Sequence, residues 1–163
     1  NTMNFKPLIG SLLLLPFAAS ALNIYPQVSS TIVSMANTGT SVKKGDIIVQ
    51  LDDRQAQLEL QSLKVIKSIK QQTFDDRLLE FNQAQELYDR LSASHRDVEI
   101  AKLAFDAAKR QLDAHQILIQ IKKIELEKYQ IKSPMDASVE ETPNLRNTTN
   151  VANPKILMVL TPK

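Results

Sequence analysis

The sequence predicts an α+β fold in which a long antiparallel α-helical hairpin lies between two strand-rich segments. The stretch from Arg54 to Tyr129 contains neither Gly nor Pro, the two residues that most disfavour a helix interior. Its second half repeats apolar residues in steps of three and four, which is the pattern of a coiled-coil seam. Short apolar runs among Gly, Pro, Asn and Asp flank this stretch on both sides and are typical of strands and turns.

The composition favours long helices over a compact enzyme core. Among 163 residues, 20 Lys and Arg nearly balance 18 Asp and Glu, and no block of like charges indicates a nucleic-acid-binding arm. The absence of cysteine excludes disulfides, thiolate metal sites and a cysteine nucleophile. There is no phosphate loop, nucleophile elbow or metal-ligand spacing. We therefore expect no catalytic residue, no metal, no cofactor and no nucleic-acid partner.

Residues 1–21 have the pattern of a secretory signal peptide. A short, weakly basic start precedes an apolar run from Leu8 to Leu15, and Ala19-Ser20-Ala21 supplies the small residues that a signal peptidase accepts. The alternative is an uncleaved membrane anchor. The run from Leu8 to Leu22 has only 15 residues, whereas a membrane span needs about 20. Cleavage after Ala21 would place the mature chain in the periplasm of a Gram-negative cell.

Residues 25–52 form the first strand-rich segment. Val28, Ile32, Val33 and Met35 lie in a β-branched, polar setting, and Gly39 marks a turn. A second turn, at residues 43–46, precedes a short apolar run at residues 47–51 that we expect to be a buried strand. Asp52 or Asp53 is expected to cap the helix that follows, because a short carboxylate accepts the free N–H groups of a first helical turn.

Residues 53–130 are expected to form the hairpin, because a stretch of this length is too long for one ordinary globular helix. We place its tip near residues 92–95, where Ser94 would cap the second helix and Asp97 would complete a capping-box-like pair. Two helices of about 36 to 38 residues, joined by a short turn, should pack antiparallel, and each would be roughly 55 Å long. Such an arm has no thick core and is suited to reaching and docking.

Each helix has an expected contact seam. In the second helix, eight of ten seam positions are apolar or aromatic. They are Val98, Ala101, Phe105, Ala108, Leu112, His115, Ile119, Lys122, Leu126 and Tyr129. In the first helix the rhythm is less regular, and we place the seam at Leu60, Leu63, Ile66, Phe74, Leu78, Phe81, Gln85 and Tyr88.

Residues 131–163 form the second strand-rich segment. Pro134 disfavours helix at the residue before it and so ends the hairpin. Val139 and the run at residues 156–160 are the strand candidates, with a polar, turn-rich stretch at residues 144–153 between them. The order of elements predicts two half-domains that must meet to bury their apolar faces, with the hairpin inserted between them.

Two half-motifs flank the hairpin. The first comprises Gly39, the turn Val42-Lys43-Lys44-Gly45-Asp46 and the run Ile47-Ile48-Val49 that ends in Leu51-Asp52; the second is Ile131-Lys132-Ser133-Pro134-Met135-Asp136-Ala137-Ser138-Val139. In this order, over about residues 28–160, they resemble the periplasmic adaptor proteins, or membrane fusion proteins, of bacterial tripartite efflux and secretion systems. The resemblance implies a coiled-coil hairpin inserted between the two halves of a lipoyl-like (biotinyl-lipoyl) β-sandwich.

The chain departs from the family pattern at several points. Ala137-Ser138 and Ser29-Ser30 stand where the family commonly has Gly, and the Gly that often precedes the final strand is missing near Asn153-Pro154. The sequence stops at Lys163, after the lipoyl-like domain and before the domains with which adaptors grip the inner-membrane transporter. The three alternatives are a minimal adaptor, a truncated product and a relative that lost this contact.

The resemblance implies a function in assembly. The chain would be a periplasmic adaptor subunit of a multidrug or export pump, bridging an inner-membrane transporter of unknown class and an outer-membrane exit duct, as a homo-oligomer. The alternative is a stand-alone periplasmic coiled-coil protein, structural or chaperone-like, without a transporter. A lipoyl or biotin carrier is a further class, but the hairpin occupies the place of the lysine-bearing turn.

The hairpin tip is the family's docking surface for the exit duct, often with an Arg, a Leu and a Ser at set spacing. Leu87 and Ser94 fit the Leu–Ser spacing, whereas the Arg position falls on Gln83. Arg90 and Arg96 lie nearby as substitutes, and Leu91 completes the expected docking set.

The two histidines are too few for a convincing metal site. We interpret His115, on the seam, as a polar residue that sets helix register. His95, at the tip, is either a solvated turn residue or a sensor of acidity, because a free histidine titrates near pH 6.5. Asp75 and Asp76 are adjacent along a helix and do not face each other, so they form no acid–base dyad.

Overall fold

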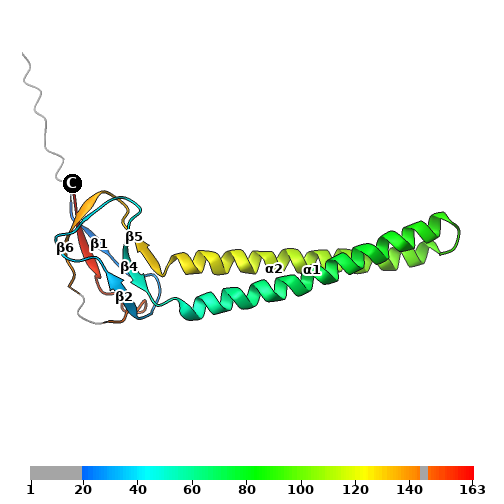
Figure 1. Ribbon diagram of the computed structural model, residues 1–163, viewed down its shortest axis with the longest axis horizontal. Coiled ribbons are helices and arrows are strands. Elements are labelled where there is room, and N and C mark those ends of the chain that lie inside the picture. Colours follow the sequence, from blue (N-terminus) through cyan, green and yellow to red (C-terminus); the bar gives the residue numbers. More distant parts are fainter. Residues whose placement is uncertain (1–19, 144–146) are drawn as a thin grey trace, which may run out of the picture.

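The computed structural model describes residues 20–143 and 147–163 and shows a small β domain from which a two-helix arm projects (Figure 1). The predicted signal peptide, residues 1–21, lies outside the described residues except for its last two positions. The elements are β1 (Leu22–Ile24), β2 (Ile32–Met35), β3 (Ser41–Val42), β4 (Ile47–Leu51), α1 (Arg54–Asp89), α2 (His95–Glu127), β5 (Gln130–Lys132), β6 (Ala137–Glu141) and β7 (Met158–Pro162). The predicted α+β class is confirmed, and β1 is a strand that the sequence did not indicate.

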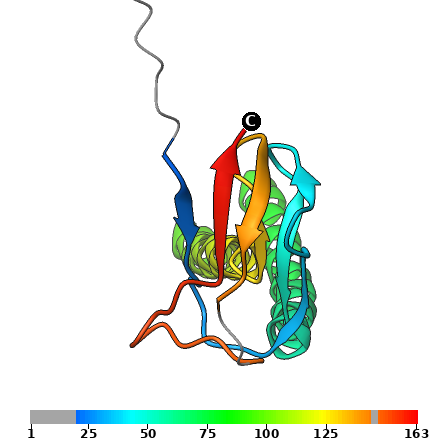
Figure 2. The same cartoon turned by 90° about the vertical axis from the view of Figure 1, so that its left-hand side faces the viewer.

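The strands form two antiparallel sheets, and each sheet needs strands from both sides of the hairpin. One sheet has the order β1-β7-β6-β3, which Figure 2 shows with β7 in red between β1 and β6. The other has the order β2-β4-β5. Strands β1 to β4 precede the arm in the chain and β5 to β7 follow it, so neither segment can complete a sheet alone.

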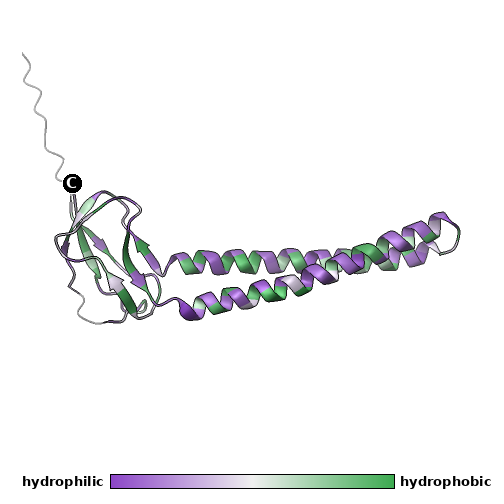
Figure 3. Cartoon of the chain, in the orientation of Figure 1, coloured by the Kyte–Doolittle hydropathy of each residue, from purple (hydrophilic) through white to green (hydrophobic). Residues whose placement is uncertain are grey.

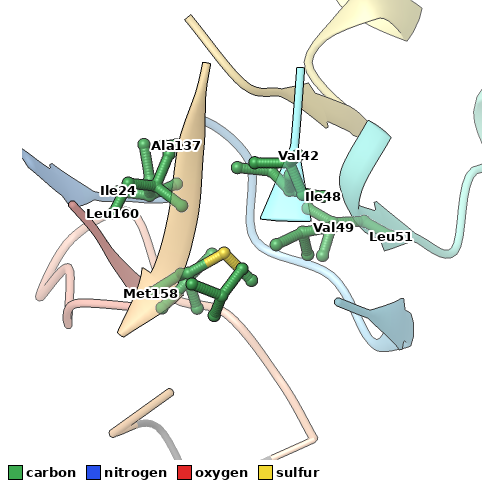
Figure 4. Close-up of a cluster of buried hydrophobic side chains, with 10 residues drawn as sticks. Ile24, Val42, Ile48, Val49, Leu51, Ala137, Met158 and Leu160 are labelled. Atoms are coloured by element: carbon green, nitrogen blue, oxygen red, sulfur yellow. The ribbon is translucent and has the colours of Figure 1, made fainter. Parts of the chain in front are cut away.

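Both sheets contribute to one apolar core. Val49 and Leu51 from β4 are fully buried, as are Met158 and Leu160 from β7 (Figure 4). The whole cluster is Ile24, Val42, Ile48, Val49, Leu51, Ala137, Val139, Leu157, Met158 and Leu160. Burying a large aliphatic side chain contributes about 1.5 to 3 kcal/mol, so this cluster is the main apolar contribution to the β domain.

The two half-motifs lie side by side. The backbone N–H of Lys44 donates to the Asp136 carboxylate at 2.8 Å, and that of Gly45 donates to the carbonyl of Ser133 at 2.8 Å. Gly45 has a φ of 93°, in the left-handed region that favours glycine. The turn before β4 is thereby fixed to the segment that follows the hairpin.

The base of the arm is held by β4 and β5. The Leu51 N–H donates to the carbonyl of Tyr129 at 2.8 Å, and Gln50 pairs with Gln130 in the sheet. Helix α2 ends at Glu127, three residues before the predicted end of the hairpin at residue 130, because Gln130–Lys132 are drawn into pairing with β4. The start of α1 and the end of α2 thus lie next to each other.

The start of α1 is capped by Asp52, one of the two carboxylates expected in this role. Asp53 stands at the cap position but its side chain makes no capping bond. Asp52 takes that role, because its carboxylate accepts the Arg54 N–H at 3.2 Å and also pairs with the Arg54 guanidinium at 2.6 Å. Hydrogen bonding from Arg54 lowers the pKa of Asp52 to about 2.

The seam of α2 is confirmed, and that of α1 is confirmed in part. Every predicted α2 position is buried or half-buried, and Phe105 packs between Phe74 and Phe81 with ring centroids 5.3 and 5.8 Å away. On α1, three predicted seam positions are wrong, because they are exposed: Ile66, Gln85 and Tyr88. The residues that take part instead include Ala56, Lys67 and Ala84. Figure 3 shows that green and purple residues alternate along both helices, as a two-faced arm requires.

Within residues 20–143 and 147–163, no helix combines the length and the apolar character needed to cross a bilayer.

The α2 seam gives a stability prediction. Leu112 is 5% exposed, so Leu112→Ala removes buried methyl groups and leaves a cavity. We expect a loss of about 2 to 4 kcal/mol in the free energy of unfolding, measured by urea titration followed by circular dichroism. Leu118→Ala, on a residue that is 50% exposed, is the matched control and should cost less than about 1 kcal/mol. Equal losses in the two variants would contradict the assigned seam.

Candidate protein-docking site at the hairpin tip

The end of α1 closes with a tight backbone turn. The Leu91 N–H donates to the carbonyl of Tyr88 at 2.9 Å, and the Ser92 N–H donates to that of Leu87 at 2.7 Å. This pair of bonds is the Schellman arrangement, which satisfies the free carbonyls of a helix end. It requires the residue after the C-cap to adopt a left-handed backbone, and here that residue is Leu91, with a φ of 60°.

Leu91 is unusual in both backbone and side chain. A non-glycine residue in the left-handed region costs roughly 1 to 2 kcal/mol, and glycine is the usual residue at this position. Leu91 is also 94% exposed, the highest value among the exposed large hydrophobic residues of the described chain. A strained backbone that holds an apolar side chain in solvent has no structural benefit for the isolated chain, and such strain clusters at binding sites.

The start of α2 is fixed by a capping box, as predicted. The Asp97 N–H donates to the Ser94 hydroxyl oxygen at 3.3 Å, and the Ser94 N–H donates to the Asp97 carboxylate at 2.8 Å. The Ser94 hydroxyl also donates to the Asp97 carboxylate at 2.6 Å. These hydrogen bonds lower the pKa of Asp97. The loop between the helices is therefore held at both ends.

The five predicted docking residues lie within the last turn of α1, the loop and the first turn of α2. Leu87 is 46% exposed, and Arg90, the C-cap of α1, is exposed. Arg96 is exposed in the first turn of α2. Ser94 is exposed too, but its hydroxyl already serves the cap. The tip thus presents two leucines and two arginines to solvent, whereas Gln83 lies two turns below the end of α1.

Tyr88 and His95 belong to the tip as well. The sequence pattern placed His95 there but did not place Tyr88 there. Their ring centroids are 5.9 Å apart, one ring from each helix. His95 Nε2 also lies 3.3 Å from the Glu99 carboxylate. The two tilted rings therefore lie next to each other across the loop. Both residues flank the predicted break between the helices, but the periodicity assigned Tyr88 to the inner seam.

The remaining polar candidates have structural roles. His115 is 5% exposed, and its Nε2 lies 2.7 Å from the carbonyl of Leu63 on α1, so it links the helices. Lys122 lies 2.7 Å from both Glu59 and Glu125, and these two carboxylates raise its pKa. Among the described residues, no cluster of three or more His, Cys, Asp or Glu side chains is suited to a metal ion.

Known proteins of similar structure are membrane fusion and adaptor proteins. The chain matches the membrane fusion protein Spr0693 from Streptococcus pneumoniae R6 with a TM-score of 0.69 at 13% identity, over 89% of this chain and 60% of that one. It matches the periplasmic adaptor protein EmrA with a TM-score of 0.57 at 9% identity, over 88% and 72%. MacA from Actinobacillus actinomycetemcomitans matches with a TM-score of 0.52 at 24% identity, over 86% and 48%.

These likenesses confirm, at the level of the fold, the resemblance seen in the sequence. The chain has the fold of membrane fusion proteins and spans 40%, 48% and 60% of the lengths of three of the solved structures that it matches. No protein-family model matches the sequence, and no curated protein matches it either.

Replacing Leu91 by glycine tests the strain at the tip. Leu91→Gly keeps the left-handed turn without the clash of a Cβ atom, so we expect the free energy of unfolding to rise by about 1 kcal/mol. Leu91→Ala, which keeps the Cβ atom, is the matched control and should change it much less. Urea titration of the three proteins measures the difference, and a destabilised glycine variant would contradict the assigned backbone.

Ser94 gives a separate prediction for the capping box. Ser94→Ala removes the hydroxyl that accepts the Asp97 N–H, and we expect a loss of about 1 kcal/mol by thermal unfolding. Ser94→Asp retains a capping oxygen and should remain within a few tenths of a kcal/mol of the unchanged chain. Equal stability of the alanine variant would show that the cap is dispensable.

Proposed function

We propose that this chain is an adaptor that bridges membrane components of a tripartite export pump, and that its hairpin tip docks an outer-membrane exit duct. The observation that carries the proposal is Leu91, a leucine held in a strained backbone with 94% of its surface exposed. A partner that covers Leu91 would gain apolar contact from a side chain that is already fixed in place.

The architecture supports a docking role rather than catalysis. The arm carries the tip far from the β domain, so the two ends of the molecule are free for different partners (Figure 1). The tip is small and rigid, with caps on both helices, which lowers the entropy lost on binding. Exposed arginines beside apolar anchors are typical of the energetic centres of protein interfaces.

In this proposal, the β domain is the part of the chain through which copies assemble. We interpret it as the lipoyl-like sandwich of adaptors, split by the hairpin, because each of its sheets combines strands from the segments before and after the arm. In this proposal, residues 25–52 and 131–163 form the two halves, and several copies assemble around the transporter. The chain would act in the periplasm after removal of the signal peptide at residues 1–21, and it needs no cofactor.

Site-specific crosslinking tests the docking of the tip. A photoreactive amino acid replaces Arg90 in a Gram-negative host that produces the chain, and the adducts are identified by mass spectrometry. We expect an adduct with an outer-membrane duct protein. Adding Leu91→Gly should reduce this adduct at least fivefold, although the same change should stabilise the fold. Loss of docking would then not be a folding defect.

Val151→Gly is the matched control for this experiment. It removes an aliphatic side chain that is 44% exposed in the β domain, and it should leave the adduct unchanged. An adduct that resists Leu91→Gly would reject Leu91 as the anchor. Adducts with soluble periplasmic proteins alone would reject the adaptor role and favour a stand-alone coiled-coil protein.

A further inference from the structure

A cleft lies at the base of the arm, where α2 leads into β5 (Figure 1). Its volume is about 430 Å³, and sites for small molecules in proteins have volumes of about 300 to 1,000 Å³. Three parts of the chain line it, namely the connection between β1 and β2, the end of α2, and β5. The apolar and charged lining residues are Tyr25, Ile124, Glu127, Lys128, Ile131 and Lys132.

The walls of this cleft are held in place by the fold. Strand β5 pairs with β4, and Ile131 of β5 packs against the core of the β domain. Tyr25 stands between two buried residues, Ile24 and Pro26. The Ile24 carbonyl accepts the Leu157 N–H at 2.8 Å, which fixes this segment to the strand region after the arm. The cleft is therefore formed before a ligand arrives, as is usual for small-molecule sites.

The fold does not use all of the apolar lining. Tyr25 is 47% exposed and Ile124 is 58% exposed, and neither belongs to the apolar core of the β domain. An exposed tyrosine ring offers a flat apolar face on which another ring can stack. The cleft therefore favours a ligand with a flat, apolar body.

The charged lining favours an anion. Lys128 and Lys132 are exposed, and neither takes part in an ion pair between residues that the structure describes. Glu127 is the one acidic residue in the lining, so the two lysines leave the cleft with a net positive charge. The nearest other carboxylate along α2, that of Glu125, lies 2.7 Å from Lys122 instead. Both ammonium groups are thus available to a carboxylate or sulfonate on a ligand.

We propose that this cleft binds a small organic anion with a flat apolar body, of the class of aromatic carboxylates and sulfonates. Tyr25 and Ile124 would contact the ring, and Lys128 and Lys132 would pair with the acidic group. Because the lining side chains are long and mostly exposed, the binding is expected to be weak and to decrease with added salt.

A ligand in this cleft would contact the end of α2, β5 and the β1–β2 connection at the same time. It would bind best when these three parts lie as they do here, and by mass action it would stabilise that arrangement. Since α2 is one helix of the arm, the ligand would strengthen the junction from which the arm projects. This site is separate from the hairpin tip and does not depend on the proposed docking there.

A titration with small probes tests the class of ligand. Benzenesulfonate is added to the isotope-labelled full chain, and the amide chemical shifts are followed by nuclear magnetic resonance. We expect saturable changes confined to the residues that line the cleft. Benzylamine has the same ring with a positive charge, and methanesulfonate has the same acidic group without the ring. Each should bind at least about fivefold more weakly than benzenesulfonate.

Two variants test the assigned contacts. Lys132→Glu reverses one charge in the cleft, and we expect it to weaken benzenesulfonate binding at least about fivefold. Tyr25→Ala removes the ring and should weaken binding several-fold, whereas Tyr25→Phe retains the ring and should not. Both side chains are exposed, so the variants should fold as the unchanged chain does, which circular dichroism checks.

Lys109→Glu is the matched control for charge. Lys109 is an exposed lysine of the same helix, roughly 28 Å along α2 from Lys128, and its replacement changes the net charge equally. It should leave the affinity for benzenesulfonate unchanged. Equal weakening by Lys109→Glu and Lys132→Glu would show attraction to the whole chain and would overturn the site. Shift changes that do not saturate, or tighter binding of benzylamine, would overturn it as well.

Discussion

The hydrogen bond from the Leu51 N–H to the carbonyl of Tyr129 joins the strand that leads into the arm to the segment that leaves it, at 2.8 Å. Helix α1 starts and helix α2 ends beside this bond, so the pairing of β4 with β5 fixes the separation and direction of the two helices at the base. The same pairing completes one sheet, and the second sheet likewise combines β3 with β6. The core of the β domain and the geometry of the arm therefore depend on one another, because neither set of strands buries its apolar face alone.

The arm is stabilised unevenly along its length. Near the tip, Phe105 packs with Phe74 and Phe81, and the caps at both helix ends add local stability. Near the β domain, the strand pairing holds the helices together, which permits polar groups such as Lys122 in the seam. Aliphatic side chains such as Ile117 and Ile121 lie on the exposed outer face of α2. The exposed tip lies at the end of one rigid element, and the fold is similar to that of solved membrane fusion and adaptor proteins.

Features that depend on local chemistry could be predicted from the sequence, and those that depend on tertiary contacts could not. The capping box of Ser94 and Asp97 and the end of α1 follow from residues near one another in the chain. The α1 seam failed at Ile66 because a stretch with no Gly or Pro allows several phases of the same rhythm. Strand β1 was not predicted because it forms only through pairing with β7, more than a hundred residues later in the chain. The position of the tip was predicted, but its backbone strain was not. The residues Leu91 and Ser92 carry no sequence signal for a left-handed backbone at Leu91.

The placement of the arm between β4 and β5 also constrains the order in which the chain folds. Closing a flexible loop of the arm's length costs roughly 4 kcal/mol of chain entropy before any strand contact forms. A hairpin that has already folded brings residues 51 and 129 together and removes most of this cost. A helix forms within about a microsecond, and helical bundles fold in microseconds to milliseconds, which is faster than sheets built from distant strands. A folded arm thus acts as a template for the β domain at its base. The rate at which the sheets form should then depend little on the length of the arm.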